Sequence, residues 1–262
     1  MKVTNIGTVF QLSFMPRIFP VNCYFVEEES ELTLIDTALP YSTKSIINAA
    51  KKIGKPITRI IITHAHSDHI GALDMLKELL PSSQVCISSR DALLLEGNST
   101  LLPNEKNTPI RGGLPKNIKT KPDLLLEEGD RVGSLEVIST PGHTPGSITL
   151  FDTRNQSLIA GDALITRGKL VVSGMMNLLF PFPALATWDK NTALESVKKI
   201  KRIKPKFTCC GTRKDVDATT GAFKNSDSRS RKIFTNKIGD ENNVPSYEIR
   251  IIYYFKKSNG YN

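Results

Sequence analysis

Residues 59–69 read RIIITHAHSDH, an apolar run that leads directly into a cluster of histidine and aspartate, and they decide the fold of this chain. The whole protein has four histidines, and three of them fall within this stretch. Neutral imidazole and carboxylate are the usual nitrogen and oxygen ligands of zinc and similar divalent ions. One surface histidine beside an aspartate would mean little, but four candidate ligands in six positions indicate a metal site: His64, His66, Asp68 and His69.

The secondary structure predicted around this cluster brings the candidate ligands together. Arg59–Thr63 is short and apolar on both faces, which is typical of a strand buried inside a sheet. His64 and His66 alternate as strand residues do, so their side chains can point the same way. The other two ligands fall where the chain turns into a helix predicted over Ile70–Leu80. We therefore expect all four at one strand end.

Alternating strands and helices are predicted along most of the chain. Apolar and β-branched patterns predict strands at Val9–Phe14, Asn22–Val26, Leu32–Asp36, Gln84–Ile87, Leu135–Ser139, Ile148–Phe151 and Ser157–Ala160. Helical spacing of apolar residues predicts helices at Ser42–Ile53 and Asp189–Ile203. Leu101–Pro122 is rich in Pro, Gly, Asn and Lys without periodicity, which predicts a long loop that forms a lid or faces a substrate. The alternation predicts an α/β sandwich.

Two further strand ends carry candidate ligands. His143 lies in residues 140–147, TPGHTPGS, a glycine- and proline-rich turn directly after a predicted strand. Asp162 follows the strand predicted at Ser157–Ala160, and Asp36 ends another strand, where it could orient a ligand. Each of these residues alone is more often structural than functional, but sheets commonly build sites from several strand ends. We therefore expect His143 and Asp162 to join the first cluster.

Length and composition narrow the remaining possibilities. With 262 residues, 39% of them hydrophobic, the chain suits one large domain, alone or with an appendage. Four cysteines are too few for a disulfide scaffold: Cys23 and Cys86 are predicted to be buried thiols, and a metal or redox role for Cys209-Cys210 is disfavoured. No apolar stretch is long enough to span a bilayer, and residues 1–7 lack the pattern of a signal peptide, so we expect a cytoplasmic protein without a membrane partner.

The net charge of +9 could suggest nucleic-acid binding, but its distribution argues against that. Residues 213–262 hold ten Lys/Arg against six Asp/Glu, which leaves +5 for the first 212 residues. That remainder falls mostly on predicted helix faces such as Lys198-Lys199, where solvated charge is the ordinary explanation. We expect a small-molecule substrate and no nucleic-acid partner, and the sequence predicts no oligomeric state.

The order and spacing of these motifs resemble the metallo-β-lactamase superfamily over about residues 7–212. The motifs that carry the resemblance are His64-x-His66-x-Asp68-His69, Gly142-His143-Thr144 and Gly161-Asp162. The resemblance implies a four-layer αββα sandwich with a site for two metal ions; zinc is expected, and iron and manganese are alternatives. By motif, the resemblance implies that His64, His66 and His143 hold the first metal. It implies that Asp68 and His69 hold the second metal, and that Asp162 bridges the two.

The resemblance also implies a reaction. Metal-activated water would attack an ester, thioester or lactone of a small molecule, and the metals would stabilise the developing oxyanion. Asp68 is the candidate catalytic residue, since it could orient the water or accept a proton. The TPGHTPGS segment is common in the general branch that includes glyoxalase II and lactonases. Two alternatives stay open: a mononuclear iron persulfide dioxygenase, which needs only two histidines and an aspartate, and a catalytically impaired member.

One ligand that the resemblance calls for is absent from the sequence. The superfamily normally supplies a further histidine, in a Gly-His pair after the last core strand. In this chain Gly211 is followed by Thr212, and no histidine occurs anywhere after His143. The second metal is therefore expected to be one ligand short.

The chain changes character after this point. We divide it into a metal-binding domain, residues 1–212, and an atypical basic tail, residues 213–262, predicted to be disordered or poorly packed apart from a strand at Tyr247–Phe255. Deleting one base from the Gly211 codon lets codons compatible with the downstream residues read Gly-His-Gly-Lys-Met-Leu-Met-Gln, which restores the missing pair. We hypothesise that the tail is such a frameshift product. A gene sequence whose codons cannot encode histidine in the shifted frame would refute this.

Overall fold

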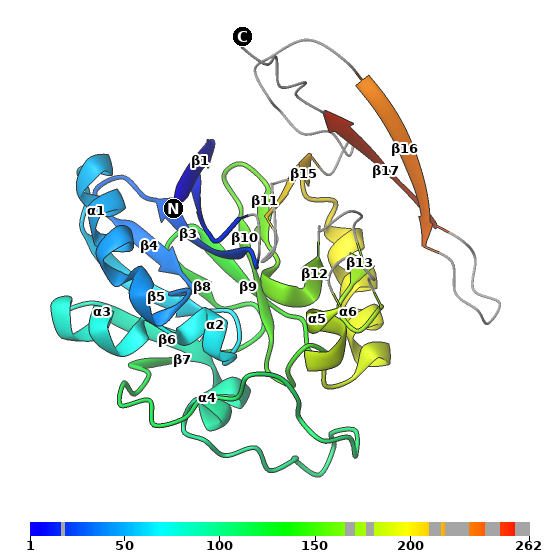
Figure 1. Ribbon diagram of the computed structural model, residues 1–262, viewed down its shortest axis with the longest axis horizontal. Coiled ribbons are helices and arrows are strands. Elements are labelled where there is room, and N and C mark those ends of the chain that lie inside the picture. Colours follow the sequence, from blue (N-terminus) through cyan, green and yellow to red (C-terminus); the bar gives the residue numbers. More distant parts are fainter. Residues whose placement is uncertain are drawn as a thin grey trace, which may run out of the picture.

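Two β-sheets pack face to face in the computed structural model of this protein, and helices lie on both outer sides (Figure 1). The structure describes residues 1–16, 19–165, 171–176 and 181–209, and beyond them the backbone of three strands. Within this described part of the chain, no helix is both long enough and apolar enough to cross a membrane.

The first sheet has seven strands that lie side by side in chain order. They are β1 (Lys2–Ile6), β2 (Val9–Phe14), β3 (Val21–Glu27), β4 (Leu32–Ile35), β5 (Ile57–Ile62), β6 (Gln84–Ser88) and β7 (Leu124–Leu126). Strands β1 to β4 pair antiparallel, whereas β4, β5, β6 and β7 run parallel. The carboxyl ends of parallel strands meet at one edge of a sheet, and the ligand-bearing loop after β5 lies at that edge.

The second sheet has six strands in the order β15-β14-β11-β10-β9-β8. They are β8 (Arg131–Val132), β9 (Leu135–Ser139), β10 (Ile148–Asp152), β11 (Ser157–Ile159), β14 (Phe207–Cys209) and β15 (Val216–Asp217). β14 runs parallel to β11, and the Ala160 amide donates to the Cys209 carbonyl at 2.8 Å. The Ile148 amide donates to the Thr63 carbonyl at 2.9 Å, which joins the two sheets beside the candidate ligands.

Helices cover the outer face of each sheet. Buried side chains of α1 (Thr43–Ile53), α3 (Leu73–Leu79) and α4 (Ser89–Leu95) pack on the first sheet, and those of α6 (Lys190–Ile203) pack on the second. The core between the sheets includes Tyr24, Ile61, Leu135, Leu150 and Ile159. Shorter elements are α2 (Ser67–Ile70), α5 (Phe182–Ala186), the 3₁₀ turns Pro40–Ser42 and Gly161–Ala163, and a ribbon of β12 (Leu164–Ile165) and β13 (Val171–Val172). The predicted four-layer αββα sandwich is confirmed.

Local sequence explains why several predicted elements are present. The helix predicted at Asp189–Ile203 is α6, and Asp189 caps it by accepting the Thr192 amide at 2.7 Å. The helix predicted at Ser42–Ile53 is α1, which ends at Gly54 with the left-handed φ of 84°. Cys23 and Cys86 are buried thiols as predicted, and burial raises the pKa of Cys86 to about 11.

The helix predicted over Ile70–Leu80 was wrong in its start and in its continuity. The chain forms two helices, α2 and α3, with a break at Gly71 and Ala72. The Gly71 amide donates to the Ala38 carbonyl at 2.8 Å, and a Cβ at Gly71 would lie 2.6 Å from that oxygen. A contact with a distant loop therefore breaks the helix, and hydrophobic periodicity does not record such contacts.

The basic tail contributes a two-stranded antiparallel sheet. β17 (Tyr247–Tyr254) matches the strand predicted at Tyr247–Phe255, and it pairs with β16 (Arg231–Ile238), a partner that the sequence did not reveal. Disorder or poor packing was predicted for the whole tail outside Tyr247–Phe255, but the structure has strands in it at β15 and β16. The rest of that prediction, such as residues 218–230 and 239–246, lies outside the described residues, as does Thr212. The frameshift hypothesis stays a prediction.

Asp152 ties the two sheets together at the end remote from the candidate ligands. It is fully buried and accepts hydrogen bonds from the Thr8 hydroxyl at 2.8 Å and from Arg154 Nη2 at 2.7 Å. Burial would raise the pKa of Asp152, but the hydrogen bonds from Arg154 and Thr8 outweigh burial and lower it.

Asp152→Asn is therefore expected to lower the free energy of unfolding by about 2 kcal/mol at neutral pH. A carboxyl with a lowered folded-state pKa stabilises the fold above its unfolded pKa of about 3.9, and it loses that effect as pH falls through the folded pKa. The difference between parent and variant should thus shrink in acid. Urea unfolding across the pH range measures it, and a difference that stays constant with pH would contradict this role.

Candidate metal centre

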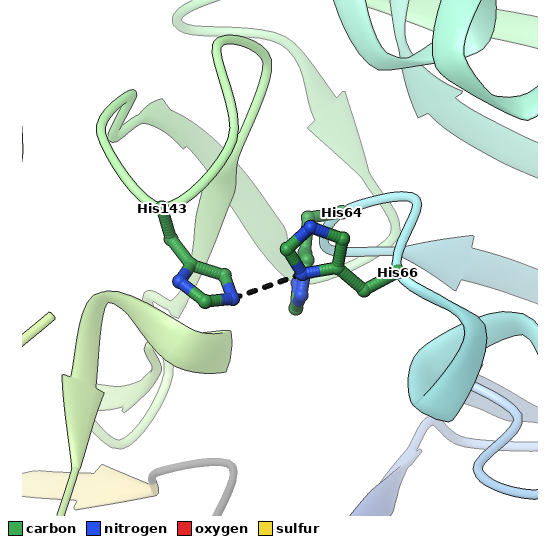
Figure 2. Close-up of side chains that lie close together, drawn as sticks. All are labelled: His64, His66 and His143. Carbon is green, nitrogen blue, oxygen red and sulfur yellow. Dashed lines mark hydrogen bonds between the residues drawn. The ribbon is translucent and has the colours of Figure 1, made fainter. Parts of the chain in front are cut away.

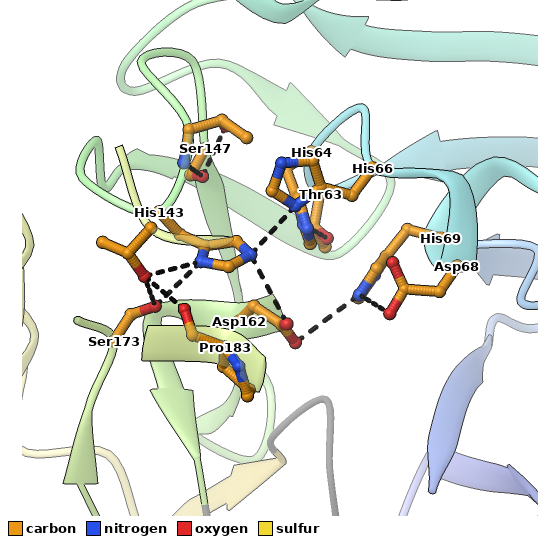
Figure 3. Close-up of polar contacts among 12 residues, drawn as sticks. Thr63, His64, His66, Asp68, His69, His143, Ser147, Asp162, Ser173 and Pro183 are labelled. Atoms are coloured by element: carbon orange, nitrogen blue, oxygen red, sulfur yellow. Dashed lines mark hydrogen bonds and ion pairs between the residues drawn. The ribbon is translucent and has the colours of Figure 1, made fainter. Parts of the chain in front are cut away.

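The candidate ligands meet at the edge where loops of both sheets converge (Figure 3). His64 and His66 directly follow β5, and Asp68 and His69 lie in α2. His143 lies in the segment after β9, and Asp162 lies in the segment after β11. Each comes from the strand end that the sequence predicted. The structure thus brings all six predicted site residues into one place.

Three histidines form the first cluster (Figure 2). His66 Nδ1 lies 3.0 Å from His143 Nε2, and the ring centroid of His64 lies 4.8 Å from the centroid of each of these two rings. All three side chains are buried, with no more than 2% of each residue exposed. One nitrogen of each ring lies within 4.8 Å of the other two, close enough for a single ion to contact all three.

The second cluster combines His64, His69 and Asp162, whose ligand atoms also lie within 4.8 Å of one another. His69 Nε2 is 3.5 Å from Asp162 Oδ1, and Asp162 Oδ2 is 3.6 Å from His143 Nε2. Asp162 therefore contacts both clusters, as the motif implies for a bridging ligand. Asp68 lies at the edge, with its Oδ2 3.9 Å from His69 Nε2 and 31% of its side chain exposed.

Among the described residues, two buried polar atoms at this site have no hydrogen-bond partner: His64 Nε2 and Asp162 Oδ1. A buried polar atom without a partner costs free energy, so each such atom in a folded protein calls for an explanation. A divalent cation satisfies both atoms, because an imidazole lone pair and a carboxylate oxygen are ordinary ligands of such ions. The donor set therefore fits a metal.

Hydrogen bonds at the far side of the second-cluster rings select which nitrogen faces the site. His69 Nδ1 donates to Asp36 Oδ2 at 2.8 Å, so Asp36 has the orienting position predicted from its strand end. Asp36 also accepts the amide and the hydroxyl of Thr63, both at 2.8 Å. The Thr63 hydroxyl has one hydrogen and donates it to Asp36, so it accepts the hydrogen bond from His64 Nδ1 at 3.2 Å. Nε2 of His64 and of His69 is left toward the cluster.

The remaining two histidines are oriented from different loops. His66 Nε2 donates to the Arg111 carbonyl at 2.8 Å, which turns Nδ1 toward the cluster. His143 Nδ1 lies 2.8 Å from the Ser173 hydroxyl and 3.1 Å from the Thr187 hydroxyl, so Nε2 is the nitrogen that faces the cluster (Figure 3). Each ring thus offers one defined nitrogen to an ion.

Burial keeps three of the histidines neutral. It lowers the pKa of His64 well below its ordinary value, lowers that of His66, and lowers that of His143 to about 3. Positive charge on neighbouring imidazoles would shift His64 and His143 in the same direction. A neutral imidazole is the form that binds a metal ion, so the first cluster needs no deprotonation at neutral pH.

Charge governs the second cluster. Burial opposes protonation of His69, but the carboxylates of Asp36, Asp162 and Asp68 outweigh burial and raise the pKa of His69 well above its ordinary value. Burial also favours neutral Asp162, yet the positive charge of His69 outweighs burial and lowers the pKa of Asp162 to about 2. A proton on His69 thus supplies the positive charge that a bound cation would supply.

A pocket of about 440 Å³ opens onto the ligands. The predicted loop Leu101–Pro122 contains no helix or strand and reaches this pocket through Gly112 and Gly113. The Ser67 amide donates to the Gly113 carbonyl at 2.7 Å, and a Cβ at Gly112 would collide with the His66 ring. The loop therefore lines one side of the pocket in close contact with His66 and Ser67, which agrees with the prediction that it faces a substrate.

Sequence reasoning missed the residues of other elements that contact the ligands or the loops that carry them. They are Asp91, Arg111, Ser173 and Thr187. For Asp91 a signal existed, because residues 88–91 follow a predicted strand with the Ser-x-x-Asp spacing of a helix start. For the other three, only the folded chain reveals the contact.

Comparison with known proteins places this architecture in a family. The sequence model of the metallo-beta-lactamase superfamily matches residues 16–212. YobT of Bacillus subtilis, an uncharacterized protein, is 52% identical over 211 residues that cover 80% of this chain and 91% of YobT. YflN of the same organism, described as a probable metallo-hydrolase, is 33% identical over 211 residues, which are 72% of this chain and 79% of YflN.

This chain is also similar to a named enzyme and to a solved metal-bound structure. The human mitochondrial persulfide dioxygenase ETHE1 is 30% identical over 158 residues, but they are 57% of this chain and only 51% of that protein. The crystal structure of TTHA1623 in a di-iron-bound form superposes with a TM-score of 0.57 at 25% identity, covering 79% of this chain and 94% of that one. With the αββα fold, the clustered ligands and the family match over residues 16–212, this chain belongs to the metallo-β-lactamase superfamily.

Proposed function

We propose that this protein is a metal-dependent hydrolase that cleaves an ester, thioester or lactone bond of a small molecule. The observation that carries the proposal is the pair of unpartnered buried atoms, His64 Nε2 and Asp162 Oδ1, beside a pocket of about 440 Å³. That volume lies in the ordinary range for small-molecule sites. The similarity to YflN, a probable metallo-hydrolase, supports the same class.

The roles of the residues follow from their positions. His64, His66 and His143 would hold a first zinc ion, with iron or manganese as alternatives, and His69, Asp68 and Asp162 would contact a second. A bound divalent ion supplies activation of water near neutral pH and stabilisation of negative charge on the carbonyl oxygen. Asp68 lines the pocket and is partly exposed, so it can orient water or accept a proton.

One wall of the pocket is apolar and suits an apolar part of the substrate. Phe19 and Phe182 meet edge to face with ring centroids 5.6 Å apart, and Leu185 continues the wall. More than half of Phe182 and of Leu185 is exposed, so this surface is available to a substrate. We propose that the group bound there is an aliphatic or aromatic acyl group.

Phe182→Ala is expected to raise KM about tenfold for esters with long acyl chains and to change kcat little, because it removes apolar contact area without touching the ligands. The test compares KM for a series of p-nitrophenyl esters of increasing chain length. Leu79→Ala, which removes an equally exposed apolar side chain from α3, is the matched control and should change nothing. An unchanged KM across the series would contradict the proposed acyl site.

Metal analysis combined with a hydrolysis panel tests the proposed function. We expect zinc in the purified protein, metal-dependent cleavage of esters, thioesters or lactones, loss of rate after chelation and recovery when zinc is added. A protein that binds zinc at these ligands but cleaves none of the three bond classes would overturn the hydrolase proposal.

A second candidate function is persulfide dioxygenation. His64, His69 and Asp162 form a cluster of two histidines and one carboxylate, the ligand type of mononuclear non-haem iron oxygenases. The similarity to ETHE1 favours the same reaction. Stoichiometric iron and consumption of oxygen with a persulfide substrate would select this function over hydrolysis.

A further inference from the structure

Asp91 is a fully buried carboxylate beside the metal centre, and it is absent from the ligand clusters. It lies in the first turn of α4, where its amide donates to the hydroxyl of Ser88, the residue that caps the helix. A buried carboxylate is costly unless several donors surround it. Its partners therefore indicate what it does.

The donors to Asp91 come from two loops, and each loop carries ligands. Its Oδ2 accepts the Ala65 amide at 2.9 Å, and Ala65 stands between His64 and His66. The same oxygen accepts the Thr144 hydroxyl at 2.7 Å, and Oδ1 accepts the Gly146 amide at 2.8 Å. These two residues lie in the turn that presents His143.

The contact between α4 and that turn leaves no spare room. A Cβ at Gly146 would lie 2.5 Å from Asp91 Oδ1 and 2.7 Å from the Ser88 hydroxyl. The Ser88 hydroxyl also donates to the Gly146 carbonyl at 2.6 Å. The start of α4 thus holds the turn through both its side chains and its close packing.

We propose that Asp91 is a positioning residue that sets the distance between the loop of His64 and His66 and the turn of His143. The three histidines of the first cluster come from two different sheets, and an ion needs their nitrogens at defined separations. One carboxylate that bonds both loops fixes that separation before the ion arrives. This proposal requires the metal binding that we propose above, but it does not depend on which reaction the protein catalyses.

The surroundings of the Asp91 side chain favour a carboxylate over an amide. The three groups that contact its oxygens all donate hydrogen bonds: two backbone amides and one hydroxyl. A carboxylate only accepts, whereas an asparagine would have to aim its own N–H at one of these donors. Asp91→Asn therefore keeps the size of the side chain and breaks the hydrogen bonds to one of the two ligand loops.

Titration of the purified full-length chain with Co²⁺, followed by visible absorption, tests the proposal. Asp91→Asn is expected to weaken Co²⁺ binding at least about tenfold and to alter the absorption spectrum, because the ligand geometry changes. Asp152→Asn is the matched control, since Asp152 is equally buried and hydrogen-bonded but remote from the ligands. It should lose stability and keep both the parent affinity and the parent spectrum.

The outcomes separate this proposal from the metal centre itself. A parent chain that binds no Co²⁺ would overturn both, whereas a parent that binds it and an Asp91→Asn variant with the same affinity and spectrum would overturn only the role of Asp91. An equal loss of affinity in Asp152→Asn would also overturn it, since the effect would then come from general destabilisation.

A second pair of variants keeps the test valid if Asp91→Asn does not fold. Thr144→Val retains the shape of the side chain but removes the hydroxyl that donates to Asp91, whereas Thr144→Ser retains the hydroxyl. We expect weaker Co²⁺ binding in the valine variant and near-parent binding in the serine variant. Parent affinity in both would count against a hydrogen-bonded link at this position.

Discussion

His64→Ala is expected to remove metal from the purified protein and to abolish metal-dependent hydrolysis. His64 takes part in both clusters, with its ring centroid 4.0 Å from that of His69 and 4.8 Å from those of His66 and His143. Changing a residue that only supports a ligand costs roughly 10- to 100-fold in metal affinity, so loss of a shared ligand should cost at least about 100-fold. Metal content per chain and a zinc titration measure this.

The stability of the same variant provides its control. Without metal, His64 Nε2 is a buried atom that lacks a partner, and alanine removes that atom. The metal-free variant should therefore melt within a few degrees of the metal-free parent, while zinc should stabilise only the parent. If His64→Ala keeps full metal content, the assignment of this centre is wrong.

Thr212→His is expected to raise the occupancy of the second metal position, which is one ligand short in the parent, and to raise the rate of hydrolysis. The last described residue of β14, Cys209, accepts the amide of Ala160, two residues before Asp162. Cys210, Gly211 and Thr212 follow Cys209 in the sequence, and the Gly211-Thr212 pair stands where the superfamily normally has Gly-His. An added imidazole there would complement His69, Asp68 and Asp162.

A matched substitution distinguishes a new ligand from a general effect. Thr212→Gln introduces a polar side chain of similar length that is a poor zinc ligand, and it should leave the metal content unchanged. Metal analysis of the parent and both variants gives the number of ions per chain. Equal metal content in all of them would mean that a missing ligand at Thr212 does not limit the second metal.

The fold and the ligands were largely predictable because local spacing encodes them. β2 and β9 have the predicted bounds, and α6 begins one residue after its predicted start at Asp189. The alternation of His64 and His66, followed by the turn into α2, is a property of one short segment, so their shared location was predictable from spacing. The helix broken at Gly71 was not predictable, since the break depends on Ala38, more than 30 residues away in the chain.

The sequence by itself determined which residues could bind a metal, because ligand chemistry and strand-end spacing are properties of short segments. Only the tertiary structure decided that His64 belongs to both clusters, that Asp36 and the Arg111 carbonyl select the nitrogen each ring presents, and that Asp91 joins two ligand loops. The physical reason is reach: a hydrogen bond acts over about 3 Å between atoms, whatever number of residues separates them. Such contacts leave no periodic trace in the sequence.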